Sequence, residues 1–138
     1  MKSRRIDGGF LLRLDRGEEV VSALMDLCAK EGIGFASISG IGAAERVTLA
    51  VFDTKTKKYL ERAFAGDIEL VSLTGNAAVA DGDPKIHIHA CISDHSFSAH
   101  GGHLVSAIIS VTCELVLLVS EETVTRKKDE RTGLMLID

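Results

Sequence analysis

The sequence predicts an α+β protein in which one main helix packs on a mainly antiparallel β-sheet. A single segment has the helical spacing of apolar residues, whereas short apolar and β-branched runs separated by Gly, Asp and Lys recur elsewhere. Hydrophobic residues make up 46% of the chain and aromatic residues only 4%, so aliphatic side chains must build the core. We expect residues 1–138 to form a single domain without a linker.

The expected helix follows Glu18 and Glu19. Apolar residues recur at helical spacing from Val20 to Cys28. The two acidic residues suit the positive end of the helix dipole, and Gly32 has the position of a C-cap. We therefore expect a helix that ends at about Gly32.

Strands are expected on both sides of this helix. A short apolar run at 9–15 precedes it, and the later runs are 34–41, 46–53, 58–64, 67–74, 86–93, 103–109 and 111–119. We expect Gly40 and Gly42 to allow a sharp turn between two strands. The segment 74–83 is expected to end a strand and turn, and 134–137 to form a last edge strand.

The compartment is predicted from the cysteines and the apolar runs. The three cysteines are widely spaced and form no CxxC pair, which indicates free thiols in a reducing compartment. No export signal is visible. The longest apolar stretch, 104–119, carries Glu114 and is shorter than the roughly 20 residues of a membrane span. We expect a cytoplasmic protein without a membrane partner.

The charge argues against tight binding to nucleic acid. The formal net charge is −4, so the whole molecule repels phosphate unless its basic residues gather on one face. Basic residues occur in three groups, within 2–5, 55–58 and 126–131, and no group is interleaved with aromatic residues for base stacking. We interpret these groups as solvated surface.

The histidines form the main candidate site. All five lie within 87–103. In a strand at 86–93, alternation places His87 and His89 on one face, about 6.5 to 7 Å apart, where both rings can converge on one metal ion. The alternative is a pair of polar residues on a solvated face.

His103 is the third candidate ligand, because Gly101 and Gly102 permit a tight turn or a close backbone approach that positions it. A simple hairpin would pair His103 with about Ser93, roughly 13 Å from His89. This distance requires either a bulge or a ligand from a neighbouring subunit. Three neutral imidazoles and an open position are typical of zinc sites, and nickel, iron and copper also accept imidazole. The expected cofactor is a divalent metal, with zinc the first candidate.

Five further residues are candidates near this cluster. Cys91 shares the face of the two strand histidines, and we interpret it as a buried thiol in preference to a ligand. Glu69 and Asn76 are candidate cofactor-binding residues, since a carboxylate near a metal can act as a base or orient a ligand; simple exposure is the alternative. His95 and His100 are interpreted as exposed loop residues.

The sequence contains none of the common catalytic and nucleotide-binding motifs. The glycines at 40–42 lack the third glycine of a dinucleotide loop and are followed by an expected strand. No GxSxG, P-loop or HExxH motif is present. The catalytic residues therefore stay unassigned.

Taken together, these segments resemble the plants-and-prokaryotes-conserved (PPC) domain, which stands alone in prokaryotes and is joined to AT-hooks in plant nuclear proteins. The matching segments, in order, are 10–14, 17–19, 39–43, 69–76, 87–89, 101–104 and 132–134. The resemblance implies an α+β fold, a homotrimer, and a metal site at His87, His89 and His103. It also implies DNA binding, although this sequence has no Arg-Gly-Arg-Pro AT-hook.

Three functional hypotheses follow. The first is a trimeric, metal-binding PPC protein with a DNA-binding or regulatory role, whose partners are its own copies, weakly bound DNA and other proteins. The second is a metal-dependent enzyme or sensor that acts on a small molecule through the open metal position. The third is a structural oligomerisation module.

Overall fold

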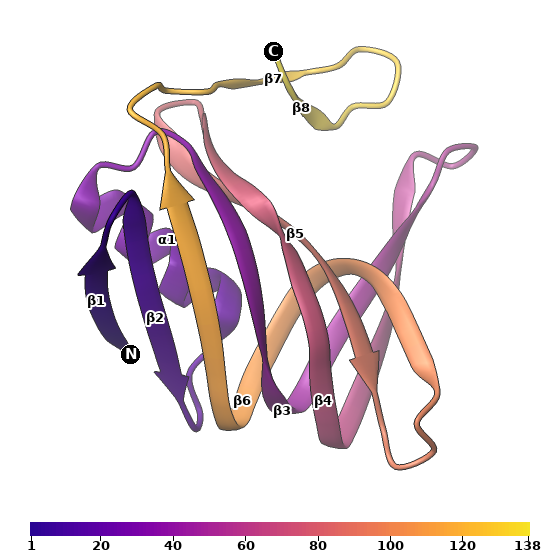
Figure 1. Ribbon diagram of the computed structural model, residues 1–138. Coiled ribbons are helices and arrows are strands. Elements are labelled where there is room, and N and C mark those ends of the chain that lie inside the picture. Colours follow the sequence, from indigo (N-terminus) through magenta and orange to yellow (C-terminus); the bar gives the residue numbers. More distant parts are fainter.

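The computed structural model describes residues 1–138 and confirms the predicted α+β fold, with one helix on a mainly antiparallel sheet (Figure 1). Six strands form the main sheet in the order β1-β2-β6-β3-β4-β5, and β7 and β8 form a separate two-stranded sheet. The elements are β1 (Lys2–Ile6), β2 (Gly9–Asp15), α1 (Val20–Glu31), β3 (Ala36–Asp53), β4 (Lys58–Ala80), β5 (Asp83–Ser93), β6 (Ala99–Val119), β7 (Arg126–Lys128) and β8 (Met135–Ile137).

The main sheet closes on itself through β6. This strand pairs with β3 along most of its length, with β2 through its second half, and with β5 through residues 99–103. Strand β5 also pairs with β4, and β4 with β3. The four strands β3, β4, β5 and β6 therefore form a ring, and the histidines lie where β5 and β6 meet.

The long strands correct three expectations about strand breaks. Residues 34–41 and 46–53 belong mostly to the single strand β3, 58–64 and 67–74 belong to β4, and 103–109 and 111–119 belong to β6. The turn expected at Gly40 and Gly42 is wrong, because the register shifts there without a reversal of the chain. A Cβ atom at Gly42 would lie 2.6 Å from the Thr112 carbonyl oxygen, so glycine is needed for close packing of β3 on β6.

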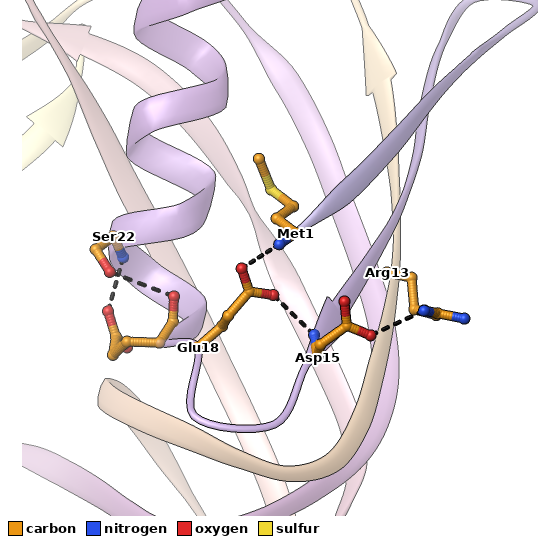
Figure 2. Close-up of polar contacts among 6 residues, drawn as sticks. Met1, Arg13, Asp15, Glu18 and Ser22 are labelled. Carbon is orange, nitrogen blue, oxygen red and sulfur yellow. Dashed lines mark hydrogen bonds and ion pairs between the residues drawn. The ribbon is translucent and has the colours of Figure 1, made fainter.

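The predicted helix is confirmed as α1. Glu19 is its N-cap and accepts hydrogen bonds from the backbone N–H groups of Val21 and Ser22. Gly32 ends the helix in the left-handed conformation, with φ of 65°. Figure 2 shows the neighbouring Glu18 carboxylate, which pairs with the amino group of Met1 and accepts from the Asp15 N–H at 2.7 Å. These contacts fix the start of the helix beside β2.

The chain ends differ from the sequence expectations. Strand β1 was not expected, because its charged residues hide the strand pattern. The predicted strand near 134–137 exists as β8, but it pairs with β7 instead of the edge of the main sheet. Hydrogen bonding between Val79 and Val124 joins the C-terminal segment to β4, and this segment crosses one end of the sheet (Figure 1).

The core is built from buried residues of α1 and of the strands of the main sheet. Helix α1 contributes Val20, Leu24, Leu27 and Cys28, all fully buried. Cys28 and Cys113 are free, and burial raises the pKa of their thiols to about 11 and about 12. No helix has the length and apolar character needed to cross a membrane.

Candidate metal centre

Strand β5 supplies two of the candidate ligands by simple alternation. Ile88 and Ile92 are 1% exposed and face the core. His87 and His89 therefore lie on the opposite face, with ring centroids 5.2 Å apart. The pairing of β5 with β4 and β6 on its two sides holds this part of the backbone in place.

His103 lies directly opposite His89 in the pairing of β5 with β6. The expected pairing with Ser93 is wrong, because the connection consists of residues 94–98 and is centred on Ser96. The ring centroid of His103 is 5.3 Å from that of His87 and 5.7 Å from that of His89. One chain therefore brings all three histidines together without a bulge between His89 and His103 or a second subunit.

The three histidines have the geometry of a metal-binding group. One nitrogen from each lies within 4.8 Å of the other two. Nδ1 of His103 is buried without a hydrogen-bond partner, an arrangement that a metal ion would satisfy. Three imidazoles are a common ligand set for zinc and other divalent transition metals. The residues present therefore fit a divalent metal ion.

Burial favours the neutral form of two of these imidazoles. Desolvation lowers the pKa of His87 below 6.5, with further lowering by Arg126 and the other two histidines. Desolvation, then the charge of His89, lowers the pKa of His103. Since imidazole binds metal only when it is neutral, both side chains are ready to bind at neutral pH.

Two residues at the site were missed by sequence reasoning. The ring of Tyr59 stacks on that of His103 at 5.2 Å between centroids. Arg126 is buried, although 126–131 was interpreted as solvated surface. Its guanidinium donates to the Met135 carbonyl at 3.0 Å and to Oδ1 of Asn76 at 2.6 Å. No sequence feature distinguishes Arg126 from the exposed Lys127 that follows it.

The structure separates the two candidate cofactor-binding residues. Asn76 lies opposite His87 in the pairing of β4 with β5. Glu69 is exposed and lies opposite Ser93, four positions along β5 from His89. It lines a different hollow, together with Ile41 and Val111. Asn76 is thus next to the histidine cluster, and Glu69 is not.

The remaining candidates lie outside the cluster. Cys91 is half-buried and is absent from the metal-binding group. His95 is exposed, as predicted, and its Nε2 lies 3.2 Å from a carboxylate oxygen of Asp67. The expectation for His100 is wrong, because it belongs to β6, is half-buried and packs against the Phe64 ring. Gly102 provides close approach to β3 instead of a turn, since its Cβ would lie 2.9 Å from the Ala50 carbonyl oxygen.

The family model of the Plants and Prokaryotes Conserved domain, abbreviated PCC or PPC, matches residues 1–121. The chain belongs to this family. The PPC protein of Pyrococcus horikoshii is 31% identical with a TM-score of 0.88, and the alignment covers 99% of this chain and 93% of that one. No curated protein matches the sequence.

Two further similar solved structures carry functional descriptions. The "putative DNA binding protein" of Bacteroides thetaiotaomicron is 32% identical with a TM-score of 0.96, and the alignment covers 99% of this chain and 96% of that one. The "metal-containing protein" of Archaeoglobus fulgidus is 36% identical with a TM-score of 0.85, covering 94% and 91%. Acetolactate decarboxylase of Bacillus subtilis, at 13% identity and a TM-score of 0.57, shares the fold alone over 82% of this chain and 53% of that one.

Proposed function

We propose that this PPC protein binds one divalent metal ion per chain through His87, His89 and His103, and that the metal site acts on a small molecule. The convergence of the three imidazole nitrogens within 4.8 Å carries the proposal. Zinc is the first candidate for the ion. When bound through three imidazoles, such an ion supplies a Lewis-acidic position open to water or a ligand.

A pocket beside the histidines supports the small-molecule role. His87 and His103 both line it, and its volume is about 340 Å³. Sites for small ligands are commonly concave and of about 300 to 1,000 Å³. This hollow favours an enzyme or sensor over a purely structural oligomerisation module.

Metal analysis of protein purified without a His-tag tests the proposal. We expect about one divalent ion per chain after incubation with zinc and removal of excess metal. His87→Ala, His89→Ala and His103→Ala should each remove most of it, because each deletes one of three ligands. His95→Ala is the matched control and should keep full occupancy, since its ring is exposed and pairs with Asp67. Equal metal content in the parent and the triple histidine variant would contradict the proposal.

DNA binding is a second candidate, favoured by the description of the Bacteroides thetaiotaomicron relative. The net charge of −4 favours weak contact that does not depend on DNA sequence. We expect a dissociation constant no tighter than roughly 10⁻⁴ to 10⁻⁶ M at physiological salt, with a steep loss of affinity as salt rises. Nanomolar binding to a defined duplex would instead favour DNA recognition over the small-molecule role.

We also propose that the chain assembles as a homotrimer. Ile41, Val71 and Val111 line one hollow on β3, β4 and β6, although they are 59%, 51% and 71% exposed. Burial of such a face between subunits would remove apolar surface from water. Light scattering at micromolar concentration should give three times the chain mass, and Val111→Asp should lower that mass. A monomeric parent protein would refute this assembly.

A further inference from the structure

Arg126 is the only charged residue that the fold buries, at 7% exposure. Both of its hydrogen-bond partners, Asn76 Oδ1 and the Met135 carbonyl, are uncharged. It takes part in no ion pair within the protein, and its Nε has no hydrogen-bond partner. A buried cation without a counter-charge is costly, so an anion at this position would relieve an existing penalty.

Two acidic residues of the C-terminal segment have partners other than Arg126. Asp129 accepts hydrogen bonds from the backbone and hydroxyl of Thr132. Asp138 pairs with Lys127 at 2.5 Å. No Asp or Glu lines the pocket that contains Arg126. The protein therefore supplies no carboxylate counter-ion for this guanidinium, and an anion from outside could take that role.

The pocket itself has the charge of an anion site. Arg126 and Lys85 are both part of its wall, and His87 and His103 form the side next to the candidate metal. A bound divalent ion would add further positive charge. Both the protein cations and the metal would therefore attract an anionic ligand.

Size and wall chemistry narrow the class of anion. A volume of about 340 Å³ lies near the lower end for ligand sites, so a small molecule fits. Four aliphatic or thioether side chains also line the wall, namely those of Ile86, Leu134, Met135 and Leu136. Such a wall favours an organic molecule over an inorganic ion. A guanidinium has five N–H groups in a planar fork that matches a carboxylate, and two of those in Arg126 are used.

We propose that this pocket binds a small organic carboxylate, which pairs with the free N–H groups of Arg126 beside the histidine cluster. The inference names the ligand class of the proposed metal site and in that sense rests on the proposed function. The contact between the carboxylate and Arg126 does not involve the metal ion, however. Metal binding and anion binding can therefore succeed or fail separately.

The test is an NMR titration of ¹⁵N-labelled protein, in metal-free and zinc-loaded forms, with propionate, its neutral analogue propionamide and inorganic phosphate. Propionate should shift the Arg126 Nε–H signal and the amide signals of 133–136, and propionamide should not. Arg126→Gln should weaken propionate binding at least tenfold. Arg131→Gln, which removes the same charge from a side chain that is 90% exposed in the same segment, should leave binding unchanged.

Each outcome decides one proposal. Equal effects of propionate and propionamide, no effect of either, or equal affinity in the two arginine variants would overturn the carboxylate site. Tighter binding of inorganic phosphate than of propionate would overturn the ligand class. If Arg126→Gln fails to fold, Arg126→Lys replaces it in the comparison with Arg131→Gln, and the Arg126 Nε–H signal of the parent protein still tests whether propionate binds at this side chain. Propionate binding without zinc uptake would refute the metal site alone, and zinc uptake without propionate binding would refute this inference alone.

Discussion

The guanidinium of Arg126 donates a hydrogen bond to Oδ1 of Asn76 at 2.6 Å, and this bond ties the C-terminal segment to β4 directly opposite His87. The segment and the histidine cluster are therefore connected through one amide. Both partners are at least partly buried, so loss of either one leaves the other with an unsatisfied polar group inside the protein.

Asn76→Ala should loosen the C-terminal segment. We expect a loss of about 1 to 3 kcal/mol in the free energy of unfolding, because the charged donor loses its acceptor. Hydrogen exchange should accelerate at residues 124–137 more than in β2. Asn76→Asp is the control, since it keeps an acceptor and adds a counter-charge. Unchanged exchange in Asn76→Ala would contradict the connection.

The paired glycines before His103 should respond differently to the same change. Gly102→Ala should displace β6 from β3 and reduce bound zinc, because the new Cβ would lie 2.9 Å from the Ala50 carbonyl oxygen. Gly101→Ala should be tolerated, because its nearest neighbour would lie 3.6 Å away, an ordinary contact. Zinc content and thermal unfolding of the two variants measure the difference. Equal zinc content in the two variants would indicate that β6 shifts without displacing His103.

The metal-free protein should lose stability in mild acid. The pKa values of His87 and His103 are lowered from 6.5 in the folded state, so the unfolded chain takes up protons first as the pH falls. Their contribution is therefore absent well above pH 6.5 and becomes destabilising as the pH drops through 6.5 toward the folded pKa values. Urea unfolding from pH 8 to pH 5 after chelation measures this loss.

The control for the acid effect is the double variant His87→Gln, His103→Gln. It lacks both titrating rings, so its stability should depend less on pH over the same range. If the parent and the double variant lose stability equally, other groups cause the acid sensitivity.

Glu19→Ala should destabilise both the helix and its contact with β6. The Glu19 carboxylate accepts from the N–H groups of Val21 and Ser22, and from that of Ala107 at 3.1 Å. Removal of an N-cap costs about 0.5 to 2 kcal/mol, and we expect the upper end because Ala107 also loses its acceptor. Glu19→Gln should lose less, since it keeps one oxygen. Urea unfolding compares the two; equal losses would show that the carboxylate charge is what matters.

Periodicity was enough to predict the helix and the orientation of His87 and His89. The predictions rested on local spacing, and the structure preserves that spacing. Strand breaks were predicted poorly, because a glycine permits a turn and a close approach equally well. Gly42 packs against β6, a contact far away in the sequence that no local pattern reveals.

The candidate site was only partly predictable for a related reason. The histidine types and their clustering indicated metal, but the pairing of His103 with His89 depends on which residue lies at the centre of the connecting loop. A difference of two residues in that centre moved the expected position by about 13 Å. Burial of Arg126 depends on the path of the C-terminal segment over β4, which its charged sequence does not show.

Strand β1 forms the outer edge of the main sheet, and the basic group within 2–5 lies on it. An exposed edge strand offers unpaired backbone groups to any passing chain and is a common starting point for aggregation. The charged side chains of Lys2, Arg4 and Arg5 oppose such pairing, because two copies would bring like charges together. The residues that conceal this strand in the sequence thus protect the native sheet from self-association through its edge.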